Sequence, residues 1–323
     1  MLTEVYPKVY RNEIPLPDFP LKTINSYIIV SDQRNLMVDT GFNTEAGRAA
    51  ILEGIRELNI DLKKTDLILT HMHSDHAGMA LYLQKLGASV YIGQTDRELL
   101  NSIMLKEKKA PFEVLAEMLS LEKEIFPSLA NLYGDNSTKE VVFHPLREGD
   151  TLNIGDFVFE VVNIPGHTPG HIGLYERKQK LFFCGDHILD HISPSVMFWG
   201  FEQDALGIYM KSLAKVYALN VKFLFTGHFN LITNHRKRIK ELISLCEERI
   251  QETKDLMAKG NMTPYETAAN LHWNIKEKWE DFSKMQRFMA VSETLTHLEH
   301  LTHKKNLKRR NIKGNLYYEP NKI

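Results

Sequence analysis

The sequence contains few of the features that mark secreted or membrane-bound proteins. Only two of its 323 residues are cysteine, Cys184 and Cys246, so it has no disulfide framework and fits a reducing compartment. Its apolar runs are shorter than the roughly 20 residues that cross a bilayer. The N-terminal stretch MLTEVYPKVYRNEIPLP has no basic segment followed by an apolar one, as a secretion signal would. These absences predict a soluble, cytoplasmic protein without a membrane partner.

The chain also lacks a strong charge of either sign. It has 40 Lys and Arg residues against 41 Asp and Glu, and a net charge of −1. This balance gives no general attraction to nucleic acid or to membrane surfaces. With 43% hydrophobic and 25% charged residues, the composition is that of an ordinary globular protein with a core. The length predicts one large domain and a smaller one.

Residues 1–235 predict an α/β domain, and residues 236–323 predict a smaller helical domain. In the first part, β-rich runs alternate with stretches of helical periodicity, as in an α/β layer. Residues 96–132 predict a helical insertion, either over the mouth of a site or on the surface. Residues 188–207, rich in Phe, Trp and Met, predict a buried interface or the wall of a substrate pocket. The expected strands span residues 5–10, 24–30, 36–38, 67–69, 90–92, 140–143, 151–152, 157–163, 171–175, 181–184 and 221–225, and the expected helices span residues 44–58, 77–86, 206–218 and 235–259.

The densest group of metal-binding side chains directly follows one of these apolar strands. The stretch THMHSDH places three histidines and an aspartate within six residues. Alternate residues of a loop can point to one spot, so His71 and His73 can share one ion while Asp75 and His76 reach a second. Neutral imidazole together with carboxylate suits zinc, iron or manganese. A plain polar loop, with Asp75 as a helix cap, would leave the histidines unexplained.

Three later strand ends also carry histidine or aspartate. His167 lies in the loop PGHTPGH, Asp186 follows the run LFFC and a glycine, and His228 follows the run VKFLF. Each is a candidate metal ligand. His171, at the start of the next strand, is expected to support the site or the fold. Asp39, in the segment DTG after a strand, is expected to close a turn or to orient a metal-bound histidine.

The C-terminal part predicts a winged-helix-like domain. Thr263-Pro264-Tyr265-Glu266 combines an N-cap, a first-turn proline and a capping-box glutamate. Helical stretches at 282–289 and 292–301 then precede a basic turn and a two-stranded ribbon, an order in which the third helix and the wing can bind nucleic acid. Glu293 and Glu299 on that helix would repel phosphates, so we expect packing or a homodimer through this domain, with nucleic-acid binding as the alternative.

Taken together, the HxHxDH motif and the later His, Asp and His residues resemble the metallo-β-lactamase superfamily, in the same order along the chain. The resemblance covers roughly residues 20 to 235. It implies a four-layer αβ/βα sandwich with the site along one edge. The implied ligands are His71, His73 and His167 for one ion, Asp75, His76 and His228 for the second, and Asp186 as the bridge between them.

The resemblance also implies a hydrolase. Two divalent ions, zinc or else iron or manganese, lower the pKa of a water that bridges them and supply hydroxide near neutral pH. The layout, including PGHTPGH, looks most like glyoxalase II (hydroxyacylglutathione hydrolase) and related thioester or ester hydrolases. His76 stands where true class B β-lactamases commonly differ, so antibiotic hydrolysis is not expected.

We therefore expect a metal-dependent hydrolase of a small thioester, ester or lactone, with Asp75 passing a proton to the leaving group. The added C-terminal domain resembles a subgroup that includes a β-lactamase-like endoribonuclease, which makes RNA hydrolysis one alternative. An iron-dependent dioxygenase of the same superfamily is the other.

Overall fold

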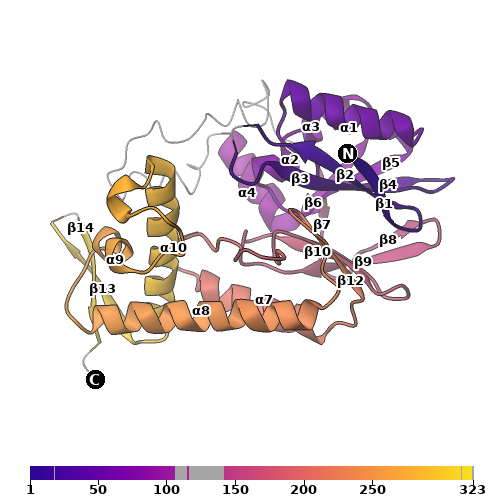
Figure 1. Ribbon diagram of the computed structural model, residues 1–323. Coiled ribbons are helices and arrows are strands. Elements are labelled where there is room, and N and C mark those ends of the chain that lie inside the picture. Colours follow the sequence, from indigo (N-terminus) through magenta and orange to yellow (C-terminus); the bar gives the residue numbers. More distant parts are fainter. Residues whose placement is uncertain (18, 106–114, 116–141, 314, 322–323) are drawn as a thin grey trace.

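The computed structural model describes residues 1–17, 19–105, 115, 142–313 and 315–321, and within them two β-sheets lie face to face (Figure 1). Both sheets are mixed, with parallel and antiparallel neighbours. The first sheet is ordered β1 (Leu2–Tyr6), β2 (Val9–Pro15), β3 (Thr23–Ile29), β4 (Asn35–Val38), β5 (Thr65–Leu69), β6 (Ser89–Gly93) and β7 (His144–Leu146). The second is ordered β12 (Phe223–Thr226), β11 (Leu181–Gly185), β10 (Ile172–Glu176), β9 (Phe157–Asn163) and β8 (Thr151–Ile154).

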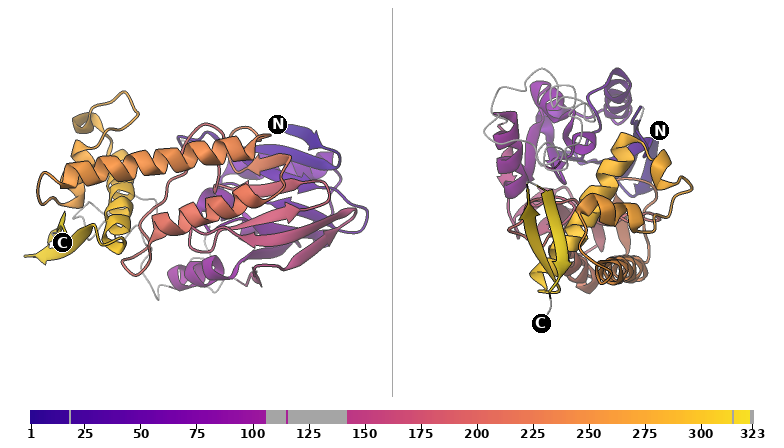
Figure 2. Two further views of the ribbon diagram at one scale, coloured as in Figure 1. Left: turned by 90° about the horizontal axis from the view of Figure 1, so that it is seen from below. Right: turned by 90° about the vertical axis from the view of Figure 1, so that its left-hand side faces the viewer.

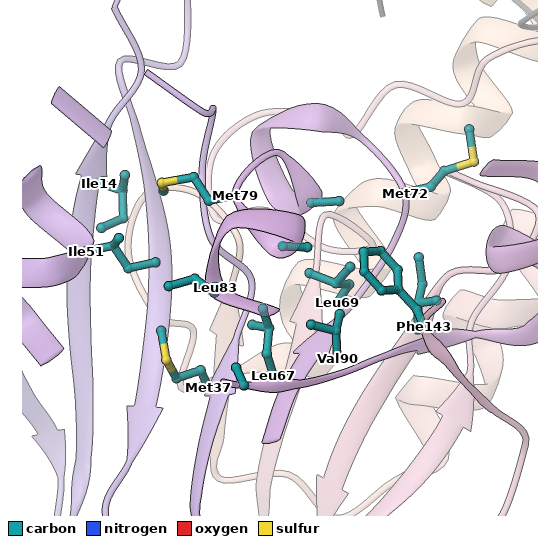
Figure 3. Close-up of a cluster of buried hydrophobic side chains, with 14 of the residues drawn as sticks. Ile14, Met37, Ile51, Leu67, Leu69, Met72, Met79, Leu83, Val90 and Phe143 are labelled. Carbon is teal, nitrogen blue, oxygen red and sulfur yellow. The ribbon is translucent and has the colours of Figure 1, made fainter. Parts of the chain in front are cut away.

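Helices cover the outer face of each sheet. The helices α1 (Glu45–Glu57), α3 (Ala80–Lys85) and α4 (Gln94–Met104) share a core with the first sheet. Figure 3 shows part of this core, in which Ile51 of α1 and Leu83 of α3 lie in one cluster with Leu67 of β5. The helices α7 (Ala205–Ala218) and α8 (His235–Met257) share a second core with the other sheet.

A third core lies between the two sheets. Successive side chains of a strand point to opposite faces, so β5 sends Leu67 and Leu69 toward the helices and Ile68 toward the second sheet. All five residues of β5 are buried, as are those of β10 and β11. The resulting order is helix, sheet, sheet, helix, which confirms the expected α/β fold.

The C-terminal helices and a hairpin lie at one end of the molecule, beyond the edges of the sheets (Figures 1 and 2). They are α9 (Pro264–Asn270), α10 (Lys284–His303), β13 (Leu307–Ile312) and β14 (Asn315–Pro320). Their core includes Phe288, Leu298 and Tyr318, together with Phe198 from the segment between β11 and α7. The helix α8 contributes Leu242 to the sandwich and Met257 to this C-terminal core. The division into two domains at residue 235 stays a prediction.

The expectation of two separate helices at 282–289 and 292–301 was wrong. One helix, α10, spans both stretches. A capping box between Ser283 and Gln286 starts it, and the junction Ala290-Val291-Ser292 contains no glycine or proline to interrupt it. Helices and a hairpin are present, but the winged-helix assignment stays a prediction.

Two further element predictions were wrong near the N-terminus. The strand expected at 5–10 is divided between β1 and β2, because Lys8 has a left-handed backbone (φ 64°) and turns the chain. The helix expected at 77–86 is divided into α2 (Ser74–Ala77) and α3. There the backbone N–H of Met79 donates to the side chain of Thr40 at 3.2 Å, a tertiary contact that local periodicity does not encode.

The strand expected at 140–143 was misplaced, since Val142 and Phe143 lie outside any strand and β7 begins at His144. Of the insertion expected at 96–132, the part up to Met104 belongs to α4. Residues 106–114 and 116–132 lie outside the described residues, as do residues 140–141.

Among the described helices, none combines the length and the hydrophobicity that crossing a bilayer requires.

Candidate metal centre

Seven histidine and aspartate side chains meet where the strands β5, β9, β11 and β12 end. They form two groups, and within each group the potential ligand atoms lie within 4.8 Å of one another. These are the seven side chains that the sequence predicted as metal ligands, and the structure brings all of them together. The first cluster consists of His71, His73 and His167, and the second cluster consists of Asp75, His76, Asp186 and His228.

The first cluster is held by hydrogen bonds on the far side of its imidazole rings. The Nδ1–H of His167 donates to the carbonyl oxygen of Ser195 at 2.7 Å, and the Nδ1 of His71 lies 3.1 Å from the hydroxyl of Thr70. Such bonds fix the tautomer and leave the Nε2 lone pair for a metal. The Nε2 of His71 and the Nδ1 of His73 lie 3.1 Å apart, a separation that suits two ligands of one ion.

The second cluster is oriented in the same way but contains carboxylates. The Nδ1–H of His76 donates to Asp39 at 2.8 Å, and the Nδ1–H of His228 donates to the carbonyl oxygen of Thr23 at 2.7 Å. The Nε2 atoms of both histidines therefore face inward. Asp75 Oδ2 lies 3.3 Å from the Nε2 of His228.

Asp186 lies between the two clusters. Its Oδ1 is 3.4 Å from the Nε2 of His76, and its Oδ2 is 3.4 Å from the Nε2 of His228. The same Oδ2 is 3.9 Å from the Nε2 of His167 in the first cluster. One carboxylate thus faces ligand atoms of both clusters, which is the position that a bridging ligand needs.

Four of these inward-facing atoms are buried and have no hydrogen-bond partner within the described part of the chain. They are Nε2 of His76, His167 and His228, and Oδ1 of Asp186. A buried polar atom without a partner costs about 1–3 kcal/mol, and four such atoms aimed at one place indicate a ligand that satisfies them. Imidazole nitrogens and carboxylate oxygens fit a pair of divalent ions.

Burial and charge act differently on the histidines of the two clusters. Burial lowers the pKa of His71 well below its usual range and lowers the pKa of His73 to about 3. Burial alone would also lower the pKa of His76 and His228. The neighbouring carboxylates together outweigh burial, Asp186 most strongly: with Asp39 and Asp75 it raises the pKa of His76 well above normal, and with Asp75 it raises that of His228 to about 10. The first cluster is therefore neutral at pH 7, and the second carries protons before a metal binds.

Asp39 makes the contacts that an orienting role requires. Its carboxylate accepts the Nδ1–H of His76 and also the backbone N–H and the hydroxyl of Thr70, at 2.8 and 2.7 Å. Asp39 thereby connects the second cluster to Thr70, whose hydroxyl lies next to the Nδ1 of His71 in the first cluster. The backbone at Asp39 itself is left-handed (φ 59°). Its hydrogen bonds fit the orienting role, which stays a prediction.

His171 belongs to neither cluster but packs against both. Its ring stacks on His71 with centroids 4.7 Å apart and planes inclined by 14°. Its Nε2 accepts the backbone N–H of Asp186 at 3.3 Å. This placement agrees with the expected supporting role, which stays a prediction.

The aromatic segment between β11 and α7 forms both an interface and a border of the site. Phe198 packs into the C-terminal core, whereas the indole of Trp199 lies nearly parallel to the His73 ring, with centroids 6.4 Å apart. The Nε1–H of Trp199 donates to the carbonyl oxygen of His167 at 3.2 Å. Its aromatic composition was the only sequence signal for this position.

Sequence reasoning missed a buried carboxylate beside the first cluster, Asp96. Its side chain is fully buried at the start of α4, and burial raises its pKa to about 6 although three hydrogen bonds act in the opposite direction. A single aspartate in the first turn of a helix is common because it complements the helix dipole. The sequence therefore offers no signal that sets Asp96 apart.

Comparison with known proteins identifies the family. Residues 20–228 match the family model described as the Metallo-beta-lactamase superfamily. The chain belongs to this superfamily. Its membership and the two His/Asp clusters show a metal-dependent hydrolase, and the clusters are consistent with a dinuclear metal site.

Relatives within the superfamily match different lengths of the chain. It is 24% identical over 299 residues to "Probable metallo-hydrolase YqjP" of Bacillus subtilis, across 88% of this chain and 89% of that protein. It is 32% identical over 164 residues to "Hydroxyacylglutathione hydrolase GloC" of Haemophilus influenzae, across 50% of this chain and 65% of that protein. A metallo-beta-lactamase family protein from Thermus thermophilus shares the fold with a TM-score of 0.81 at 24% identity, across 98% of this chain and all of that one.

Proposed function

We propose that this protein hydrolyses a small thioester, ester or lactone with the help of two divalent ions, zinc being the first expectation and iron or manganese the alternatives. The observation that carries the proposal is the position of Asp186 between the two clusters: its own Oδ1 and three histidine nitrogens around it are buried and have no hydrogen-bond partner among the described residues. The name of the GloC relative, a hydroxyacylglutathione hydrolase, supports an acyl substrate.

In this proposal each cluster would hold one ion, and Asp186 would serve as a ligand for both. The bound ions would lower the pKa of a water and polarise the carbonyl oxygen of the substrate. The chain contributes the fixed directions of its ligands, because the far side of three rings is hydrogen bonded to Asp39 or to a backbone carbonyl oxygen. The proposed ligands are His71, His73 and His167 for the first ion, and Asp75, His76 and His228 for the second.

Asp75 is the proposed proton carrier. Burial alone would raise its pKa, but His76 and His228 lower it below the usual value, so the carboxylate is ionised at neutral pH. An ionised carboxylate can accept the proton released when water attacks the acyl carbon and can pass it to the departing thiolate or alkoxide. The bond between the acyl carbon and the leaving group breaks, and an acid and a thiol or alcohol result.

Elemental analysis and a substrate panel test the proposal together. The purified full-length chain, supplied with zinc, should contain two metal equivalents and should hydrolyse thioesters, esters or lactones. The panel also contains phosphodiesters and short RNAs. Hydrolysis of RNA without hydrolysis of any acyl substrate would overturn the proposal, as would a metal content well below two equivalents after reconstitution.

A basic hollow on the C-terminal hairpin favours the endoribonuclease as a second candidate function. Lys305, Lys308, Arg309 and Arg310 line it. The guanidinium of Arg309 is paired with Glu299 at 2.9 Å, which reduces the positive charge available to phosphates. The RNA arm of the panel separates the two candidates, and reversal of the charges of Lys305 and Lys308 should reduce RNA hydrolysis only.

A further inference from the structure

Asp96 connects the two loops that supply the first cluster. Its Oδ2 accepts the backbone N–H of Met72, at 3.0 Å, and the hydroxyl of Thr168, at 2.7 Å. Its Oδ1 accepts the backbone N–H of Gly170 at 2.6 Å. Met72 lies between His71 and His73 in the sequence, and Thr168 follows His167 directly. A single carboxylate therefore binds both ligand-bearing segments.

The chain approaches Asp96 too closely for a side chain to intervene. A Cβ added to Gly170 would lie 2.2 Å from the backbone nitrogen of Asp96, and one added to Gly93 would lie 2.3 Å from the carbonyl oxygen of Gly170. Real Cβ atoms essentially never make such contacts. The start of α4 and the loop after β9 are thus held in direct backbone contact, with the Asp96 carboxylate buried between them.

Different groups support the second cluster. The Nδ1 atoms of His76 and His228 are bound to Asp39 and to the carbonyl oxygen of Thr23, and no hydrogen bond recorded for the described residues joins Asp96 to either histidine. A substitution of Asp96 should therefore affect metal binding at the first cluster more than at the second.

We propose that Asp96 is a positioning residue for the first metal, fixing the separation between the His71–His73 loop and His167. The inference rests on the proposed assignment of ions to clusters. The three donors are the N–H groups of Met72 and Gly170 and the hydroxyl of Thr168. An ionised carboxylate has two acceptor oxygens and no hydrogen of its own, so it can accept all three hydrogen bonds. Partners that orient metal ligands typically affect metal affinity about 10- to 100-fold.

Asp96→Asn is the main test variant. Asparagine has nearly the same volume, but its NH2 group would face donors that need an acceptor. We expect about one bound metal instead of two under conditions that fill both sites of the unaltered protein, with affinity at the first cluster lowered about 10- to 100-fold. Thr168→Val removes one of the three donors and should give a smaller change in the same direction, so it keeps the test informative if Asp96→Asn folds poorly.

Asp66→Asn is the matched control. Asp66 is also a buried carboxylate, and it lies near the other end of β5, where it is bound to Arg34. Its loss should lower the stability of the protein, measured as the Tm of the metal-free form, without changing the metal content. A purely structural role of Asp96 would make the two variants behave alike.

Cobalt(II) shows which site is affected. The visible spectrum of bound cobalt depends on its ligands. The ion retained by Asp96→Asn should therefore have the same spectrum as the ion retained by His167→Ala, a variant that lacks one imidazole of the first cluster. A spectrum like that of His228→Ala would overturn the inference, as would two ions bound with unaltered affinity. If the unaltered protein itself fails to bind two ions, the proposed function fails as well. If it binds two and Asp96→Asn also does, only the role of Asp96 fails.

Discussion

Both clusters contain histidines, but only the second also contains carboxylates, so the two differ in charge. The first cluster has three histidines, and burial lowers the pKa of each of them. The second has two histidines beside two carboxylates, whose charge raises the pKa of both imidazoles. The comparison teaches that histidines in two neighbouring buried clusters can favour opposite protonation states when only one cluster contains carboxylates.

They also differ in which part of the chain supports them. Ser195 and Trp199, from the segment that packs against the C-terminal core, contact His167 of the first cluster. Thr23 and Asp39, from the first sheet, contact the second cluster. Changes in these two parts of the molecule should therefore separate the clusters experimentally.

Asp186→Ala should have the largest effect, because it removes the carboxylate that faces both clusters and is proposed to serve both ions. We expect metal and hydrolytic activity to be lost together, with activity reduced more than about 100-fold. Elemental analysis and acyl hydrolysis measure the two losses. Asp156→Ala, at an exposed ion pair with Lys8, is the control. Full activity with two bound metals in Asp186→Ala would refute the assignment of Asp186.

His167→Ala should remove one proposed ligand from the first cluster and His228→Ala one from the second. Each variant should leave the other cluster intact. Each variant is expected to retain about one metal, and both should lose activity about 100-fold or more, since catalysis needs both ions. Cobalt spectra should differ between the two variants because the retained ligands differ. Identical spectra would show that the ligands form one site rather than two.

Metal binding should release different numbers of protons at the two clusters. At pH 7 the raised pKa values of His76 and His228 keep both protonated in the metal-free protein, so the second ion must displace up to two protons. The first cluster is already neutral and should release almost none. Affinity of the second site should therefore fall as the pH falls, by about tenfold per pH unit for each displaced proton.

Titration calorimetry in two buffers of different ionisation enthalpy measures this release. The expected result is one nearly proton-neutral binding event and one that releases protons. Equal release at both sites would contradict the difference in charge between the clusters.

Asp39→Asn should weaken mainly the second cluster. Asparagine can keep only one acceptor oxygen for the donors of His76 and Thr70, so the imidazole of His76 loses its orientation or its tautomer. We expect about a 10- to 100-fold loss of metal affinity there, measured by competition with a chelator. If Asp39→Asn instead lost only the cobalt absorption assigned to the first cluster, Asp39 would act through Thr70 and His71.

Trp199→Phe should have the smallest effect. It keeps an aromatic ring beside His73 but removes the hydrogen bond to the carbonyl oxygen of His167, which is worth about 0.5–1.5 kcal/mol. A severalfold change in KM for acyl substrates, with kcat and the second metal little altered, is expected. Tyr217→Phe, on α7 beside Arg236 and Lys240 of α8, provides the comparison, and an equal change in both variants would exclude a role for Trp199 at the site.

Local sequence was enough to predict most strands and all seven members of the clusters. Each of them lies in the segment that follows an apolar strand, and so many histidines and aspartates gathered at strand ends are unusual without something to bind them. One error arose where a distant contact acts on the backbone: Met79, between α2 and α3, is bound to Thr40. The continuity of α10, by contrast, agrees with the absence of glycine and proline at residues 290–292, a signal that local sequence does contain.

The sequence by itself determined which donors are available, because histidine and aspartate at strand ends are visible in a single chain. Only the tertiary structure decided how these donors are shared, oriented and charged. Asp186 lies between the clusters because β11 is placed next to β12 and faces the first sheet. The tautomers of His167 and His228 depend on carbonyl oxygens of Ser195 and Thr23, and since every residue has a carbonyl, no motif can reveal which one is used.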